Sequence, residues 1–397
     1  MKYLQITDDF YWIGVENPDL RRFDIIMETE FGTTYNSYLL KTTEGVVLFE
    51  TVKDKFFDVY LEKVKELVKL EDIKYIVCNH TEPDHSGSIE KFLELNPNIE
   101  ILSTIAAQNN LKEIVNGPFN GRIVKDQEEL TIGGRTLRFI MAPNLHWPDT
   151  MYTYIVEEEI LITCDSFGAH YATNEVLLSQ VANRENYERA FTYYTNMIMG
   201  PFKPFVAKAM DKIRDLPIRY IATGHGCLID QEVEDFIKRY DDFTKVKVNE
   251  VKKVVIAYVT AYGYTREMAN IIKAELEQHN LHVEIYDLVE DDNDKAYEAI
   301  VQADGVLYGS CTIVGDALPP IWQLMNRVLT AYDGIKVASA FGSYGWSGEA
   351  VPNLMVRLKQ QKMKLVDEGL RVKFKPSEAQ KEEIRAYAEN FAKALVD

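Results

Sequence analysis

Short apolar runs alternate with polar turns through the first 250 residues. Strands are predicted where apolar residues alternate or run together, at 34–40, 45–52, 73–79, 99–104 and 218–225. Two hairpins are predicted at 131–140, with its turn at Gly133-Gly134, and at 151–165. Apolar residues at helical spacing predict helices over 55–69, within 185–215 and over 231–249. This order favours mixed sheets with helices on their outer faces.

The pattern changes near residue 250. From Lys252 onward, strand-like and helix-like segments alternate strictly to the end of the sequence. Five such strand–helix units over about 145 residues predict a doubly wound parallel sheet. We therefore expect two domains, 1–250 and 251–397, joined by a short charged link rather than a long flexible one.

Composition narrows the possible functions. Hydrophobic residues make up 46% and charged residues 27% of the chain, which is ordinary for a folded protein. The net charge of −18 disfavours nucleic acid and anionic membranes as partners, because phosphates would be repelled. No apolar run reaches the length of a membrane span, and the N-terminus lacks the apolar core of a signal peptide. Four scattered cysteines suit a reducing compartment, so a cytoplasmic location is expected.

The densest chemistry lies in residues 80–85, His-Thr-Glu-Pro-Asp-His, directly after the strand predicted at 73–79. Three more candidate ligands, His146, Asp165 and His225, also follow strand-like runs. Because all of them come at carboxyl ends of predicted strands, the sheets can gather them on one edge. Imidazole together with carboxylate suits iron that changes oxidation state.

The order His-x-Glu-x-Asp-His…His…Asp…His resembles the metallo-β-lactamase superfamily, with Glu82 in place of the second histidine of its zinc hydrolases. In that form it is similar to the flavodiiron proteins, also called A-type flavoproteins. The resemblance covers most of the chain, including HTEPDHSGS, LHWPDTM and GHG. It implies an N-terminal metallo-β-lactamase-like αββα sandwich followed by a flavodoxin-like doubly wound sheet.

The same resemblance implies a ligand set for two iron ions. One iron would be held by His80, Glu82 and His146. The other would be held by Asp84, His85 and His225, with Asp165 bridging the two irons. In some relatives the histidine corresponding to His85 swings away and water replaces it, so both arrangements remain open.

Other residues near these positions have separate interpretations. The alternation of side chains along a strand predicts that the neighbouring cysteines point away from the metal and act as small buried groups, at Cys78, Cys164 and Cys227. His170 and Tyr194 are candidates for contacts just outside the ligand shell, on the resemblance alone. Asp24 stands where some relatives have a histidine in the active-site pocket.

Three loops of the second half could hold a flavin. No lysine-containing phosphate loop and no Gly-x-Gly-x-x-Gly follows the first strand, but a Thr-x-x-Gly-x-Thr loop offers hydroxyls and N–H groups to a phosphate. Two more loops follow the third and fourth strands, where a flavodoxin-like sheet binds its ligand. The candidate residues are Thr260, Tyr262, Gly263, Tyr264, Thr265, Ser310, Thr312, Ile313, Val314, Gly315, Ser343, Tyr344, Gly345 and Trp346. The resemblance to flavodoxin implies FMN.

The resemblance implies an oxidoreductase that passes electrons from an external donor through FMN to two irons, where dioxygen is reduced to water or nitric oxide to nitrous oxide. It also implies a head-to-tail homodimer or a dimer of dimers, with a rubredoxin-like protein or reduced deazaflavin as donor. Two other hypotheses remain: a zinc hydrolase fused to a flavodoxin-like module, and an electron carrier whose first domain is only a scaffold. The sequence does not choose between the two gases.

Overall fold

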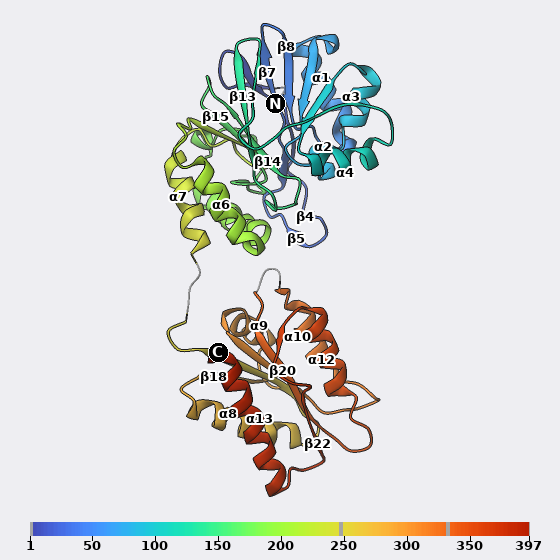
Figure 1. The fold of residues 1–397 in the computed structure, drawn as a ribbon, viewed down its shortest axis with the longest axis vertical. Coiled ribbons are helices and arrows are strands. Elements are labelled where there is room, and N and C mark those ends of the chain that lie inside the picture. The colour runs from blue at the N-terminus through green and yellow to red at the C-terminus, as the bar shows by residue number, and fades with distance from the viewer. Residues whose placement is uncertain (1–2, 246–248, 331–333, 397) are drawn as a thin grey trace. The chain divides into compact units, whose positions relative to one another are not determined.

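The computed structural model describes residues 3–245, 249–330 and 334–396 (Figure 1). The chain divides into two compact units, Met1–Val246 and Lys247–Asp397. The division predicted from the sequence, between residues 250 and 251, comes four residues later. No helix within the described ranges is long and apolar enough to cross a membrane.

The first unit contains two large sheets and two small ones. The seven-stranded sheet has the order β1 (Leu4–Gln5), β2 (Phe10–Trp12), β7 (Tyr38–Thr42), β8 (Gly45–Phe49), β9 (Ile73–Val77), β10 (Glu100–Ser103) and β11 (Asn120–Ile123). The five-stranded sheet has the order β12 (Glu129–Ile132), β13 (Arg135–Met141), β14 (Met151–Ile155), β15 (Ile160–Cys164) and β16 (Tyr220–Thr223). The small sheets pair β3 (Val15–Asn17) with β6 (Thr33–Tyr35), and β4 (Arg22–Phe23) with β5 (Met27–Glu28).

Helices cover the outer face of each large sheet. Beside the seven-stranded sheet lie α1 (Phe57–Leu67), α2 (Pro83–Ser86), α3 (Ile89–Leu95) and α4 (Ile105–Val115). Beside the five-stranded sheet lie α5 (Arg184–Tyr194), α6 (Lys203–Ile213) and α7 (Val233–Thr244). Short 3₁₀ turns occur at Asp54–Phe56, Leu70–Asp72, Leu178–Gln180 and Gly200–Phe202, and a π-helical turn at Thr195–Met199.

Alternating apolar residues explain the layering. In β8, Val46 and Leu48 join the core under α1, α3 and α4, whereas Val47 and Phe49 face the second sheet. This period of two is what a strand buried on both faces requires. The first unit is therefore the predicted αββα sandwich.

The second unit is one parallel sheet with helices on both faces. Its order is β18 (His282–Asp287), β17 (Lys253–Val259), β19 (Gly305–Ser310), β20 (Val337–Tyr344) and β21 (Lys364–Leu365), with β22 (Leu370–Lys373) also paired to β20. One face packs against α9 (Asn293–Gln302), α10 (Pro319–Arg327) and α12 (Ala350–Gln360). The other packs against α8 (Tyr264–Gln278) and α13 (Glu378–Val396). The predicted doubly wound, flavodoxin-like sheet is confirmed.

Several predicted boundaries differ from the structure for local reasons. The strand expected at 34–40 is split into β6 and β7, because the side chains of Asn36 and Ser37 bond to other segments. The helical stretch within 185–215 is broken at Gly200-Pro201, where proline cannot continue an α-helix. Helix α7 ends at Thr244, and the rest of the helix predicted to 249 includes residues 246–248, outside the described residues.

Lys63 of α1 is an unusual core residue, since its side chain is buried and its Nζ lies 4.6 Å from the Trp12 ring centre. Nζ donates to the carbonyl oxygen of Gly14 at 2.5 Å. Burial lowers the pKa of Lys63 to about 8, although Glu16 opposes the shift. The folded protein therefore binds this proton less tightly than the unfolded chain does.

We predict that Lys63→Met removes a pH dependence of stability. The penalty for burying the charged amine is present below pH 8 and disappears as pH rises toward the unfolded pKa. Wild type should thus gain roughly 2 kcal/mol in unfolding free energy relative to the variant between pH 7 and pH 10. Urea unfolding at both pH values measures this, with Lys65→Met, at an exposed position of α1, as control. A constant difference between wild type and Lys63→Met would contradict the assignment.

Candidate metal centre and cofactor loops

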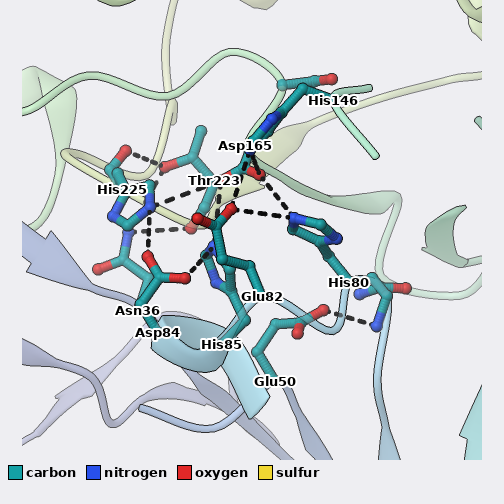
Figure 2. A network of polar contacts seen from close by, with 12 residues as sticks. Asn36, Glu50, His80, Glu82, Asp84, His85, His146, Asp165, Thr223 and His225 are labelled. Carbon is teal, nitrogen blue, oxygen red and sulfur yellow. Dashed lines mark hydrogen bonds and ion pairs between the residues drawn. The ribbon is translucent and has the colours of Figure 1, made fainter. Parts of the chain in front are cut away.

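Seven predicted ligands meet where strands of both large sheets end. His80 and Glu82 follow β9, with Asp84 and His85 next to them in α2. Asp165 follows β15, His225 follows β16, and His146 lies in the loop between β13 and β14. Their side chains point into one small space (Figure 2). The gathering expected from the strand ends is therefore present.

Asp165 lies between two pairs of imidazoles. Its Oδ2 is 3.5 Å from Nε2 of His80 and 3.4 Å from Nε2 of His146. Its Oδ1 is 3.1 Å from Nε2 of His85 and 3.5 Å from Nε2 of His225. Each oxygen of one carboxylate thus faces a different pair of ring nitrogens.

A second carboxylate accompanies each pair. Glu82 Oε2 lies 3.3 Å from Nε2 of His80 and 3.0 Å from Nε2 of His146. Asp84 Oδ2 lies 3.2 Å from Nε2 of His225, and its Oδ1 lies 3.6 Å from Nε2 of His85. These contacts define two groups, one of His80, Glu82, His146 and Asp165 and one of Asp84, His85 and His225. Within each group the candidate ligand atoms lie within 4.8 Å of one another.

Two bound metal ions would satisfy the polar atoms of these residues better than the contacts among the residues do. Both oxygens of Asp84 and Oδ2 of Asp165 are buried, yet have no hydrogen-bond partner among the described residues. A buried carboxylate oxygen without a partner is strongly destabilising. A cation in each group would satisfy these oxygens and the Nε2 atoms together, and the mixed nitrogen and oxygen donors suit iron.

The charges of the site support this interpretation. Burial opposes protonation of His80, but Asp149, Glu82 and Asp165 outweigh it and raise the pKa of His80 to about 10. Neighbouring carboxylates overcome burial in the same way and raise the pKa of His85 and of His146 to about 10. Burial works against ionisation of Glu82, but its bonds to His146 and His80 lower its pKa. Without metal, protons therefore occupy the positions that cations would take.

Contacts outside the ligand set orient two of the imidazoles. His80 Nδ1 lies 3.2 Å from Oδ2 of Asp149, which also accepts from N–H and Oγ1 of Thr81 at 2.7 and 2.8 Å. His225 Nδ1 donates to the carbonyl oxygen of Thr34 at 2.6 Å. Both bonds leave Nε2 free to face the centre. Asp149 was not predicted, although it lies only three residues after His146.

His85 lacks such a partner. Its buried Nδ1 has no hydrogen bond among the described residues. The buried Glu50 belongs to a group with His85 and Cys164 and accepts from the N–H of Asn79 at 2.7 Å. Burial raises the pKa of Glu50 to about 7, partly offset by His85. Glu50 is a second residue that the sequence interpretation missed, although it directly follows β8 as Asp165 follows β15.

The three neighbouring cysteines are free and buried, at Cys78, Cys164 and Cys227. Burial raises the pKa of each thiol. Burial thus disfavours the thiolate form of all three, as expected of small core residues, although the Sγ of Cys164 lies within 4.8 Å of a ring nitrogen of His85.

The two additional candidates do contact the centre. Tyr194 donates its hydroxyl to Oδ1 of Asp165 at 3.2 Å. His170 packs edge-on against Tyr194, with ring centres 4.8 Å apart, and its Nδ1 lies 2.9 Å from Thr33 Oγ1. Asp24 lies beside Glu82, where partial burial and a hydrogen bond to that residue raise the pKa of Asp24 to about 6.

The three predicted flavin loops of the second unit border one cavity of about 210 Å³. It is lined by Ala261, Tyr262, Tyr264, Cys311, Thr312, Ile313, Ser343, Tyr344, Gly345, Trp346 and Phe374. The sequence interpretation missed Ala261, Cys311 and Phe374. Exposed Tyr262 and Trp346 stand at the rim, available to cover a planar ring.

The remaining predicted loop residues lie outside that lining. Thr260 accepts from the N–H of Gly263, which has a φ of 83° and directly precedes α8. Thr265 is buried inside α8, with its Oγ1 3.0 Å from Ser343 Oγ. The others that do not line the cavity are Ser310, Val314 and Gly315. These residues shape the loops or lie beyond the cavity wall.

The protonated imidazoles predict pH-dependent metal binding. Metal must displace protons from His80, His85 and His146, so affinity for Fe²⁺ should rise with pH until the pKa near 10 is passed. We expect at least about a tenfold rise per pH unit between pH 6 and 8, the slope for one displaced proton. Anaerobic competition with a chelator of known protonation measures it. An affinity independent of pH would contradict the predicted charge state.

Comparison with known proteins supports the two halves separately and the chain as a whole. Residues 33–226 match the family model described as ODP family beta lactamase, and residues 256–387 match that of flavodoxin. Flavo-diiron protein FprA2 of Clostridium acetobutylicum is 38% identical, over 100% of both chains. A nitric oxide reductase of Moorella thermoacetica is 35% identical, over 91% of each. The solved rubredoxin oxygen:oxidoreductase of Desulfovibrio gigas is similar with a TM-score of 0.71, at 26% identity, over 99% of this chain and 98% of that one.

Proposed function

The chain belongs to the flavodiiron protein family, and from that membership we infer that its first unit holds two irons and its second unit FMN. It is an oxidoreductase: electrons from an external donor reach dioxygen, nitric oxide or both by way of FMN and a di-iron centre, giving water or nitrous oxide. The alternatives of a zinc hydrolase and of a plain electron carrier do not agree with this family.

The proposed ligand set follows from the position of Asp165. Because its two oxygens face separate pairs of histidines, it is suited to bridge two cations. The first iron would be held by His80, Glu82 and His146, and the second by Asp84, His85 and His225. His85 is included because its Nε2 lies 3.1 Å from Asp165 Oδ1 and so faces the centre. The proposal rests on one observation, that a separate pair of histidines faces each oxygen of Asp165.

When bound, the irons supply exchangeable ligand positions and changes of oxidation state, and FMN supplies electrons. The protein supplies geometry and protons. The Tyr194 hydroxyl donates to Asp165 Oδ1, with 3.2 Å between the two oxygens, and steadies that carboxylate. Asp149 keeps His80 in one orientation, which leaves Nε2 free for the metal. Both gas reactions consume protons, and Asp24, beside Glu82, is the proposed acid at the exposed side of the site.

Three further properties are proposed: which gases the chain reduces, which donor supplies its electrons, and where in the cell it is located. One relative is named a nitric oxide reductase, and one solved structure a rubredoxin oxygen:oxidoreductase. We propose that this chain reduces both gases and takes electrons from a rubredoxin-like protein or reduced deazaflavin. Four buried free cysteines suit a reducing compartment, and we propose the cytoplasm.

We further propose a head-to-tail homodimer, alone or as a dimer of dimers. Large apolar side chains are exposed at the flavin cavity, where Trp346 is 98% and Tyr262 is 84% exposed. In the other unit, Ile25 and Ile26 are exposed directly after Asp24. Exposed apolar groups beside both cofactor sites are what an interface between two copies would cover.

Metal analysis and gas consumption test the proposed function together. Protein expressed with iron should contain two irons per chain and consume dioxygen and nitric oxide with reduced rubredoxin. His146→Ala should lower the iron content and reduce consumption of both gases more than ~100-fold, beyond the loss typical of residues outside a ligand shell. The exposed His282→Ala is the matched control. Zinc in place of iron, with no consumption of either gas, would refute the proposal.

Mixing two inactive variants tests the head-to-tail arrangement. His80→Ala disables the iron site, and Gly263→Glu disables the flavin loop by placing a bulky anion at a residue with a φ of 83°. After subunit exchange, activity should return to about a quarter of wild type, because half the dimers are mixed and each has one intact pair of sites. Mass spectrometry verifies the exchange. Mixed dimers without activity would show that electrons move within one chain.

A further inference from the structure

Asn36 lies between β6 and β7 and is buried, and each of its side-chain polar atoms is bonded. Oδ1 accepts from the indole N–H of Trp12 at 2.8 Å. Nδ2 donates to the carbonyl oxygens of Thr223 and Gly226, both at 2.9 Å. The backbone N–H of Asn36 donates to the carbonyl oxygen of Gly224, also at 2.9 Å.

These partners allow only one orientation of the amide. An indole N–H only donates and a carbonyl oxygen only accepts, so a flipped amide would lose the bonds to Trp12 and to both carbonyls. Trp12 therefore determines which end of the Asn36 side chain faces the loop after β16.

That loop contains His225. Asn36 donates to three carbonyl oxygens around this histidine. Two belong to Gly224 and Gly226, on either side of His225, and the third belongs to Thr223, at the end of β16. Tyr38 adds a bond from its hydroxyl to the carbonyl of Thr223 at 2.7 Å. The loop has little room to shift, since a Cβ on Gly224 would stand 2.8 Å from Cε1 of His85. Figure 2 shows Asn36 and Thr223 beside His225 and Asp84.

We propose that Asn36 is a positioning residue, which fixes the backbone around His225 and so directs Nε2 of that histidine at Asp84 and Asp165. Those two contacts measure 3.2 and 3.5 Å. The bond from His225 Nδ1 to Thr34 sets the rotation of the ring, whereas Asn36 sets the place of its backbone. The inference rests on the proposed function, because it requires His225 to bind the second iron.

Asn36→Asp tests the inference with a close isostere. The aspartate keeps an acceptor for the Trp12 indole N–H. It has an oxygen in place of Nδ2, the amide nitrogen that donates to the two carbonyls. Asn96→Asp is the matched control, because Asn96 is also buried and its Nδ2 also donates to two carbonyls, of Leu70 and Ile73, at 2.9 and 3.0 Å. Those carbonyls lie in the turn before β9 and at its first residue, at the opposite end of the strand from His80.

The readouts are iron retained against a chelator, the magnetic coupling of the half-reduced centre, FMN content and thermal stability. Asn36→Asp should weaken binding of one iron by about 10–100-fold and lose the coupled signal, while FMN stays bound. Asn96→Asp should lose stability but keep two coupled irons. Two firmly held, coupled irons in Asn36→Asp, or equal iron loss in both variants, would overturn the inference.

If Asn36→Asp does not fold, Trp12→Phe gives the answer. It removes the donor to Oδ1, at the cost of a smaller buried ring beside Lys63, and should speed release of one iron to the chelator by several-fold or more. An unchanged release rate would overturn the inference. Wild-type protein without two irons would instead refute the proposed function, so the two failures are distinct.

Discussion

The concentration of carboxylates in a dry pocket is the constraint on which the first unit depends. Asp84 and Asp165 are almost fully buried, and both oxygens of Asp84 and Oδ2 of Asp165 lack hydrogen-bond partners among the described residues, so nearby cations or protons must balance their charge. Ring nitrogens on both sides of Asp165 meet this need only if β9, β15 and β16 end at the same place. The two facing sheets of the sandwich make that possible, because their cores hold the strand ends in register. The fold thus holds close together carboxylates that would otherwise repel one another.

Much of this could be predicted from the sequence because it depends on local order. Alternation along β8 and β17 identifies strands buried on both faces, and the dense group at 80–85 follows such a strand directly. Ligands at strand ends converge whenever the strands are parallel neighbours, as β15 and β16 are. Periodicity and strand order therefore carry both the fold and the ligand positions.

The residues that were missed act across long separations in the chain. Asp149 bonds Thr81 from 68 positions away, and Asn36 reaches Thr223 across 187. Such bonds join one side chain to a loop and have no period, so no spacing rule predicts them. Phe374 likewise reaches the flavin cavity from beyond β22, outside the three loops that follow strands β17, β19 and β20. Only the folded arrangement shows which isolated polar or aromatic residue belongs to a site.

The buried cysteines have a consequence for how long such an enzyme survives its own chemistry. Nitrosation and oxidation to sulfenic acid attack the thiolate, and they require access to it. Cys78, Cys164 and Cys227 lie within two residues of the proposed ligands, yet burial raises their pKa and holds them as thiols. These three thiols are therefore poor targets for both reactions, although they lie beside the site where the gases are proposed to react.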